Sequence, residues 1–327
     1  MRSTKLPSWS RSLLGLEPVL MPPHVFAVDS GRLRYGCFRE SEQSWEMSAY
    51  EEIALDEEAF VPGPLGGSLR EPERFRAPLV ELLGALGTQV SEASLVLPDS
   101  WLRLAVVETE KLPKVGKARE EVLRWMLQQI IPFKVEDLRL REIELAQLQN
   151  RQGVKRVLIG FGLDQPLSQL EELFAEQGIR IGNLVNQSLG TLSAVAHNLQ
   201  NVELGAVILL NDDGYSLSFT YRDELVLHRH RPLADQSIAE LPAGMVTRDL
   251  NLTRVFLEDL LGPVAVGRIL LIGPEETLAP WSGWLEESFG FPVLPLEAQY
   301  LALTGNLSGV PMHELAPVLG AAAQRIP

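Results

Sequence analysis

The chain has 327 residues, of which 46% are hydrophobic and 22% charged, a balance typical of a globular protein long enough for two domains. Its formal net charge of −14 argues against a general electrostatic grip on nucleic acid or on an anionic membrane. The single cysteine, Cys37, excludes an internal disulfide and a cysteine-based metal site. No apolar run approaches the roughly 20 residues of a spanning helix, and no signal peptide is visible, so we expect a soluble protein in a reducing compartment.

Two segments far apart in the chain share one pattern. Residues 25–38 and 206–220 each read as an apolar strand, an Asp-x-Gly turn and a second strand with alternating apolar positions. The turns place Asp29 before Gly31, and Asp212 before Gly214. Glycine lets the backbone approach a ligand closely, and aspartate can hold a cation beside a phosphate. One such turn is typical of an ordinary hairpin, but a pair, one in each half, indicates the phosphate clamp of actin and the sugar kinases.

The remaining periodicities predict alternating helices and strands. A Pro- and Gly-rich stretch at 61–72 indicates a loop between subdomains. The expected helices are 75–86, 119–131, 166–177, 188–199, 245–261, 278–289 and 315–324, and the expected further strands are 93–97, 101–108, 138–148, 154–162, 179–184, 224–231, 266–272 and 291–294. This order predicts an α/β protein with an inserted α+β piece.

Two charged runs allow both a functional and a plain structural interpretation. Lys111, Lys114 and Lys117 could touch anionic lipid or an acidic partner, but we expect a solvated loop there. His228 and His230 alternate with arginines and share one face of a strand. The two imidazoles could bind a metal, but no third ligand is evident, so we expect a paired, half-exposed strand.

A helix and the segment after it carry the most specific resemblance. The helix contains Arg124-Trp125 and ends at Ile131-Pro132-Phe133, because proline cannot continue the backbone ladder, and the acidic pair Glu136-Asp137 follows. In this segment, and in the Pro98-Asp99 turn and strand before it, the chain resembles PilM, the actin-like cytoplasmic protein of type IV pilus assembly. The resemblance covers roughly residues 25–325. It implies an actin-like two-domain fold, shared with the cell-division protein FtsA, with an inserted subdomain that serves protein contacts.

The resemblance also sets the expected domains. Residues 1–22 would form an N-terminal tail, and residues 23–64, 160–204 and 311–327 the first actin-like subdomain. Residues 65–159 would form the inserted subdomain and residues 205–310 the second actin-like subdomain. A short connection from Arg231 to Thr247 predicts that the helical subdomain of the second half is reduced.

The resemblance implies a nucleotide site, but this chain departs from the family pattern there. The matching positions are Asp29, Gly31, Arg32, Asp212, Gly214, Ser216 and Gly273. The first loop continues Arg32-Leu33-Arg34, where the family usually has serines and a lysine, and Gly273 is followed by Pro274-Glu275-Glu276 instead of a second glycine. Carboxylates in that position would repel a phosphate. We therefore expect a degenerate nucleotide site with no catalytic residues, no metal and no cofactor; ATP with Mg²⁺ is the alternative.

The expected function follows from the same resemblance. It implies a structural adaptor of type IV pilus assembly and twitching motility, cytoplasmic and held at the inner membrane through a partner. That partner would be the cytoplasmic N-terminal peptide of a PilN-like protein, beside other platform proteins and no nucleic acid. Trp101, Trp125 and Phe133 could line its groove, because aromatic side chains anchor interfaces. The alternatives are an actin-like ATPase that gates the platform and a cytoplasmic platform protein of type II secretion.

Overall fold

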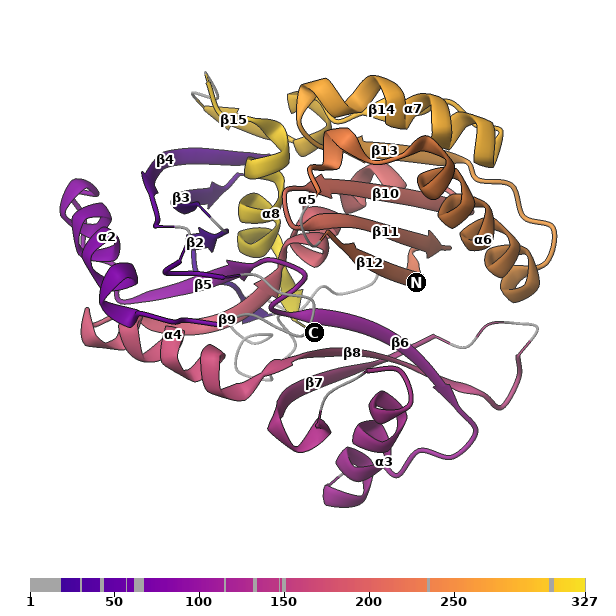
Figure 1. Cartoon of the computed structure of the whole chain (residues 1–327), viewed down its shortest axis with the longest axis horizontal. Helices are drawn as coiled ribbons and strands as arrows, with labels where there is room; N and C mark the ends of the chain where they lie inside the picture. Colours follow the sequence, from indigo (N-terminus) through magenta and orange to yellow (C-terminus); the bar gives the residue numbers. More distant parts are fainter. Residues whose placement is uncertain are drawn as a thin grey trace, which may run out of the picture.

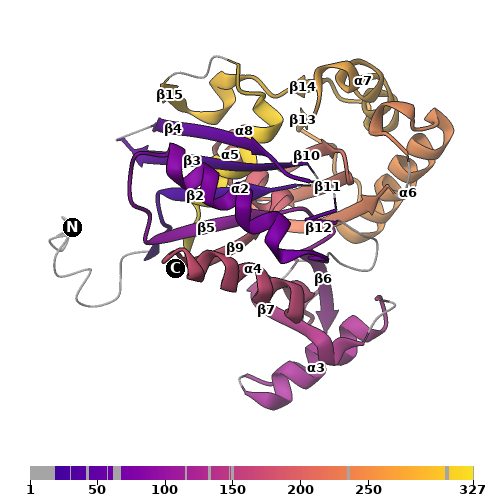
Figure 2. The same ribbon diagram turned by 60° about the vertical axis from the view of Figure 1, so that its left-hand side comes forward.

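The structure is a computed structural model. It describes residues 19–29, 31–41, 44–56, 58–61, 68–114, 116–131, 134–146, 148, 151–233, 236–305 and 309–326. Two large sheets, one in each half of the molecule, stand on either side of a central helix pair, and a smaller sheet projects from one end (Figures 1 and 2). The hairpins predicted at 25–38 and 206–220 lie in different sheets, as an actin-like fold requires.

The first domain is built on a six-stranded sheet in the order β15-β4-β3-β2-β5-β9. Its strands are β2 (His24–Val28), β3 (Arg32–Glu40), β4 (Trp45–Ala54), β5 (Glu92–Leu97), β9 (Arg180–Asn186) and β15 (Leu303–Gly305). β2, β3 and β4 form an antiparallel meander, whereas β5 and β9 continue the sheet in parallel with β2. Helices α2 (Pro72–Ala85) and α4 (Asp164–Glu176) cover the outer face through buried Phe75 and Phe174.

The second domain is built on a five-stranded sheet in the order β12-β11-β10-β13-β14. Its strands are β10 (Leu204–Asn211), β11 (Gly214–Tyr221), β12 (Glu224–Pro232), β13 (Arg268–Ile272) and β14 (Val293–Pro295). Helices α6 (Ala243–Leu261) and α7 (Glu275–Phe289) pack on its outer face. Between β12 and α6, the described residues hold only one short 3-10 helix, η2 (Ile238–Glu240), so the helical subdomain is reduced as predicted.

Helices α5 (Gln187–Leu199) and α8 (Met312–Ala323) lie between the two large sheets (Figure 1). Their apolar side chains join those of both sheets in one buried cluster. The two helices approach each other at glycines, because a Cβ atom on Gly320 would stand 1.7 Å from the carbonyl oxygen of Gly190. A side chain at this crossing would therefore force the helices apart.

The projecting piece is a three-stranded sheet with one helix. The sheet has the order β6-β8-β7, made of β6 (Arg103–Thr109), β7 (Leu138–Leu145) and β8 (Lys155–Leu163). The helix α3 (Lys117–Gln128) covers one face through buried Leu123 and Leu127, and a 3-10 turn η1 (Val135–Asp137) precedes β7. We call residues 103–163 the inserted piece.

These pairings correct three predicted boundaries. The inserted piece begins at β6 and not near residue 65, because β5 pairs with β2 and α2 packs on the first domain. β15 pairs with β4, so it lies in the first domain and not in the second. β1 (Val19–Leu20) pairs with β16 (Arg325–Ile326), so these two residues form a strand, whereas the rest of the predicted tail up to residue 18 lies outside the described residues. In the described part of the chain, no helix has the length and apolarity to cross a membrane.

Candidate functional site: an interdomain cleft and an apolar groove

The two predicted turns meet at one small cavity between the domains. Asp29 follows β2 in the first domain, and Asp212 follows β10 in the second; both line the cavity, together with residues of α5 and α8. The lining is Ala27, Asp29, Arg34, Val96, Pro98, Gln187, Asn211, Asp212, Asp213, Pro274, His313, Glu314 and Pro317. The cavity measures about 50 Å³, whereas pockets for small organic ligands usually measure about 300–1,000 Å³. In this arrangement it is too small for a nucleotide.

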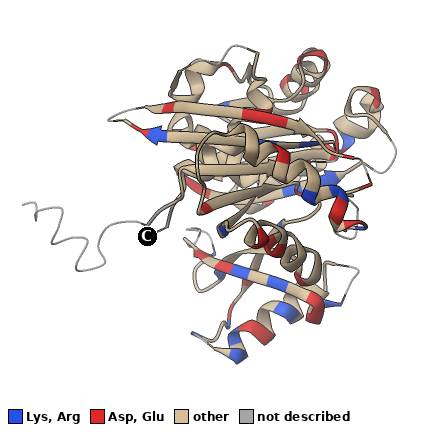
Figure 3. Ribbon diagram, turned by 90° about the vertical axis from the view of Figure 1, so that its left-hand side faces the viewer, with Lys and Arg blue, Asp and Glu red and all other residues tan. Residues whose placement is uncertain are grey.

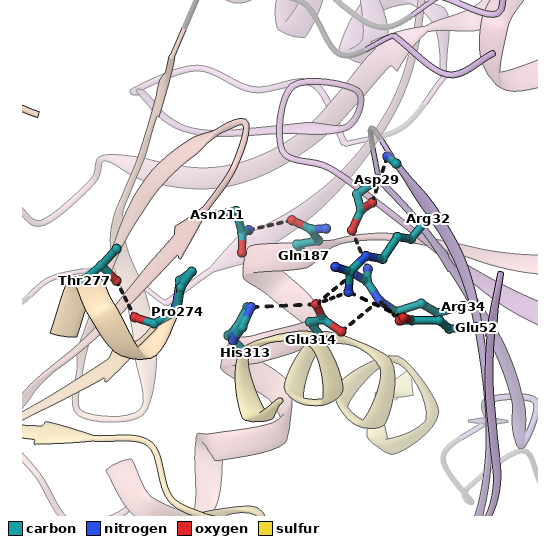
Figure 4. A network of polar contacts seen from close by, with 11 residues as sticks. Asp29, Arg32, Arg34, Glu52, Gln187, Asn211, Pro274, Thr277, His313 and Glu314 are labelled. Carbon is teal, nitrogen blue, oxygen red and sulfur yellow. Dashed lines mark hydrogen bonds and ion pairs between the residues drawn. The ribbon is translucent and has the colours of Figure 1, made fainter. Parts of the chain in front are cut away.

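The guanidinium of Arg34 fills the first-domain side of this cleft (Figure 4). It forms a short ion pair with Asp29, donates from Nε to Glu314 Oε2 at 3.1 Å, and lies 3.3 Å from Glu52 Oε2. The residue is only 5% exposed. Burial alone would lower the pKa of Arg34, but the charges of Asp29 and Glu314 outweigh it and raise that pKa above its ordinary value. Asp29, the predicted cation ligand, is thus already bound to an internal cation.

The other predicted nucleotide contacts have structural partners of their own. Arg32 lies at the rim, with its side chain 48% exposed and Nη1 at 3.1 Å from Glu314 Oε1. The Gly31 amide donates to Asp29 Oδ1 at 3.2 Å, and the buried Ser216 hydroxyl lies 3.0 Å from His230 Nδ1. None of these three lines the cavity among the described residues.

Two of the predicted glycines are required by packing between strands. A Cβ on Gly214 would stand 2.3 Å from the carbonyl oxygen of Arg231 on the neighbouring strand β12. A Cβ on Gly273 would stand 2.7 Å from the Cβ of Leu210. Both positions therefore need glycine whether or not a phosphate approaches the backbone.

A buried polar cluster, which the sequence does not reveal, joins the domains beside the cavity. Asp99 accepts hydrogen bonds from Asn186 Nδ2 at 2.5 Å and from the Ser188 hydroxyl at 2.9 Å. The next residue, Ser100, donates across the domain boundary to Asp213 Oδ2 at 3.1 Å. Burial and the neighbouring charge of Asp213 raise the pKa of Asp99 to about 8, so this carboxyl is mainly neutral at pH 7.

The two histidines of β12 belong to the same cluster. His228 is 7% exposed, and its Nε2 lies 3.8 Å from Asp99 Oδ1, while its Nδ1 lies 3.0 Å from the Ser218 hydroxyl. Burial lowers the pKa of His228 and of His230 to about 3, so both imidazoles are neutral. The run is paired with β11 and half exposed as expected, since His228 is buried whereas Arg231 is exposed. Within the described ranges, no His, Cys, Asp and Glu side chains are grouped to hold a metal ion.

A much larger groove separates the inserted piece from the first domain. It measures about 1,210 Å³ and is lined on one side by β6, β7 and β8, and on the other by β9, α5 and the end of α8. Much of the lining is apolar: Leu102, Leu104, Leu140, Ile143, Leu158, Ile181, Leu184 and Leu189. β7 and β9 are edge strands of their sheets, so each presents unpaired backbone groups. Such a groove suits an extended peptide.

The three aromatic residues predicted for partner binding do not form this groove. Trp101 is 2% exposed, stacks on Phe60 with ring centroids 4.1 Å apart and donates from Nε1 to the carbonyl oxygen of Val61. Trp125 is 62% exposed on α3 and is absent from the described lining of the groove. Phe133 lies outside the described residues. The groove depends on aliphatic side chains of strands, which the sequence shows only as ordinary core positions.

Comparison with known proteins supports the fold assignment. No protein-family model matches the sequence, and no curated protein matches it. A solved PilM–PilN type IV pilus biogenesis complex contains a chain that superimposes with a TM-score of 0.72 at 16% identity, covering 93% of this chain and 97% of that one.

Two further solved structures are similar at 11% identity. One is a Bacteroides thetaiotaomicron protein of unknown function with an actin-like ATPase fold, with a TM-score of 0.52 over 90% of this chain and 94% of that one. The other is the cytoplasmic domain of EpsL, an inner-membrane component of the type II secretion system of Vibrio cholerae, with a TM-score of 0.50 over 92% of this chain and 94% of that one. The chain thus has an actin-like fold, and its resemblance to PilM is confirmed in its three-dimensional structure.

Proposed function

We propose that this protein is an adaptor of type IV pilus assembly at the cytoplasmic face of the inner membrane. It binds the N-terminal peptide of a PilN-like membrane protein in the groove between the inserted piece and the first domain. The observation that carries the proposal is this groove, in a chain whose fold matches a solved PilM–PilN complex over 93% of its length. Its apolar walls and its two edge strands offer both side-chain burial and backbone pairing to a peptide.

We further propose that the nucleotide site is degenerate and that peptide binding needs no ATP. Four carboxylates, those of Asp29, Asp212, Asp213 and Glu314, line the cavity. Its guanidinium, Arg34, is already held by Asp29 and Glu314. A triphosphate would therefore have to displace Arg34 from two carboxylates and enter a negatively charged cleft. This arrangement supports a structural role for the cleft and not an ATPase cycle.

The similarity to the EpsL cytoplasmic domain favours a second candidate, a cytoplasmic platform component of type II secretion. Its TM-score of 0.50 against 0.72 for the pilus complex ranks it below the adaptor. The neighbouring reading frame separates the two: a short protein with a cytoplasmic stub and one spanning helix directly downstream would favour the pilus system.

A pull-down with the PilN-like N-terminal peptide tests the groove. Ile143→Glu places a charge on an apolar groove wall at a side chain that is already 64% exposed, so the variant should fold normally. Burying an unpaired charge against a bound peptide costs well over the roughly 1.4 kcal/mol that corresponds to tenfold in affinity. We expect at least a tenfold loss of binding, with or without ATP.

Val80→Glu is the matched control, since Val80 is 47% exposed on α2 and outside the described lining of the groove. It should bind the peptide as the parent chain does, with both variants showing the parent circular dichroism. If Ile143→Glu retains full binding while Trp125→Glu abolishes it, the peptide docks on α3 and the groove assignment is wrong.

A further inference from the structure

Positive charge is concentrated in one part of this acidic chain. The inserted piece contains five of the six lysines in the sequence, and its twelve Lys and Arg outnumber its eight Asp and Glu. In the rest of the sequence, 17 Lys and Arg stand against 35 Asp and Glu. The inserted piece therefore carries a formal charge of +4 in a chain whose remainder carries −18, and it forms the lower end of the molecule in Figure 3.

The lysines around α3 have no partners, unlike the arginines of that helix. Four lysines are exposed and form no ion pair with any residue that the structure describes: Lys111, Lys114, Lys117 and Lys134. Arg119 and Arg124, in contrast, pair with Glu142 and Glu120. The positive charge left for a partner is therefore carried by lysines, at and beyond the two ends of α3.

Two apolar side chains stand exposed between these lysines. Trp125 on α3 is 62% exposed, and Ile130, just beyond the helix end, is 59% exposed. The other tryptophans that the structure describes are buried or half-buried. We call Trp125, Ile130 and the four unpaired lysines the α3 patch. This patch combines apolar surface with free positive charge.

The α3 patch and the groove lie on opposite faces of the inserted sheet. On β8, Leu158 lines the groove, whereas its neighbours Val157 and Ile159 pack in the same cluster as Leu123 and Leu127 of α3. The helix α3 also lies at the outer end of the inserted piece, away from the two large sheets, in both views (Figures 1 and 2). A peptide in the groove therefore leaves the α3 patch uncovered.

We propose that the α3 patch docks on the anionic lipid surface of the membrane. The inference rests on the proposed function, because a groove that holds the peptide of a membrane-spanning partner brings the inserted piece close to the bilayer. Lysine side chains reach anionic headgroups while their stems cover apolar surface, and tryptophan favours the interfacial region. The same surface repels the −18 of the remaining chain, so this contact fixes which end of the molecule faces the membrane.

A lipid surface suits the α3 patch better than an acidic protein does. Arginine, with its planar fork, is the residue suited to the fixed carboxylates of a protein, whereas lysine is a flexible point charge. Both arginines of α3 are already held by carboxylates of the inserted piece, and only lysines remain free. Unfixed cations around an exposed ring match a fluid surface of anionic headgroups, which presents no fixed pattern of acceptors.

Co-flotation of the whole chain with lipid vesicles tests the inference without any peptide. We expect the chain to bind vesicles that contain phosphatidylglycerol, to bind them less at high salt, and not to bind pure phosphatidylcholine vesicles. The triple variant Lys111→Gln/Lys114→Gln/Lys117→Gln should weaken binding roughly hundredfold, at about fivefold for each lysine near an anionic surface. Trp125→Ser should weaken it about tenfold, because the apolar ring no longer leaves water.

Two matched controls separate the α3 patch from the general surface. The triple variant Arg180→Gln/Arg222→Gln/Arg254→Gln removes the same number of charges from arginines outside the inserted piece, all in exposed ion pairs that contribute little to folding. Phe256→Ser removes an exposed ring from α6 of the second domain. Both controls should bind anionic vesicles as the parent chain does, and every variant should show the parent circular dichroism.

Three results would overturn the proposal. A parent chain that does not bind anionic vesicles would leave the α3 patch to an acidic protein. An equal loss in the lysine and arginine triple variants would show an effect of overall charge and not of the patch. A Trp125→Ser chain that binds as tightly as the parent would remove the apolar half of the contact.

The peptide pull-down tests the proposed function separately. No residue of the α3 patch is among the described residues that line the groove, so Trp125→Ser should bind the peptide as the parent chain does. Failure to bind vesicles beside a positive pull-down would remove the lipid contact and leave the adaptor. A negative pull-down beside intact vesicle binding would remove the groove assignment and leave the lipid contact.

Discussion

Replacing Arg34 by methionine tests whether the internal cation holds the cleft together. The substitution keeps the length of the side chain but leaves Asp29 and Glu314 without their buried partner. Removing one member of a buried ion pair typically costs about 3–5 kcal/mol, because an uncompensated charge stays behind. At about 2–4 °C per kcal/mol for a large domain, Arg34→Met should lower the melting temperature by roughly 6–20 °C in differential scanning calorimetry.

Arg32→Met is the matched control for this experiment. Arg32 contacts Glu52 and Glu314, two of the same carboxylates, but its side chain is 48% exposed. Exposed ion pairs contribute only about 0.2–1 kcal/mol, so the control should melt close to the parent protein. Equal melting temperatures for the two variants would refute the claim that Arg34 is the internal counter-ion of the cleft.

A second substitution in the same variant gives a second readout. Without the guanidinium, the carboxylates of Asp29 and Glu314 stay in the cleft with no buried cation between them. Replacing one of the two by its neutral amide removes one uncompensated charge. Adding Glu314→Gln to Arg34→Met should therefore recover part of the lost melting temperature at pH 7, whereas no recovery would mean that the loss comes from packing.

Three further outcomes are expected. Calorimetry with ATP and Mg²⁺ should show no binding tighter than about 100 μM, which corresponds to roughly −5.5 kcal/mol, whereas a tight signal lost in Asp212→Ala would favour the ATPase. Asp99 carries a folded-state pKa of about 8, so its contribution to stability is lost as the pH rises from about 4 to 8. Asp99→Asn should therefore flatten the fall of the melting temperature with pH in that window. If the melting temperature of the variant falls as steeply as that of the parent, the Asp99 carboxyl is ionised. Gly320→Ala should abolish stable folding, because its Cβ meets the Gly190 carbonyl oxygen. Gly283→Ala on α7 has open space around the new Cβ and should stabilise the folded protein by about 0.5–1 kcal/mol. Equal melting temperatures for these two variants would contradict the close crossing of α5 and α8.

The sequence predicted those features that depend on local pattern. The two hairpins and the order of helices and strands could be read from periodicity and from the Asp-x-Gly turns. The reduced second-half subdomain followed from the short connection between Arg231 and Thr247, compared with the pattern of the PilM family. The boundary of the inserted piece could not, because the loop at 61–72 looks like a domain junction, although the sheet pairing returns β5 to the first domain. Strand partners are set by tertiary contacts and not by the composition of the connecting loop.

The candidate site was predictable only in its acidic half. Asp29 and Asp212 could be predicted from their Asp-x-Gly turns. The residue that neutralises Asp29 is Arg34 on β3, and Glu314, the second partner of Arg34, lies 280 positions further along the chain. No pattern in the sequence marks Arg34, whose partner Glu314 lies on α8. In the same way, the buried His228 of the second domain lies 3.8 Å from Asp99 of the first. Contacts between distant segments leave no periodic signal in a single sequence.

The uneven distribution of lysines also decides how this protein can be handled at a surface. Amine-reactive dyes, biotin esters and activated sensor chips attach to lysine, and the exposed lysines at 111, 114, 117 and 134 all lie on the inserted piece. Because every lysine except Lys5 lies on the inserted piece, amine coupling would place much of the attachment around α3. Coupling of this kind would cover α3 and its exposed Trp125.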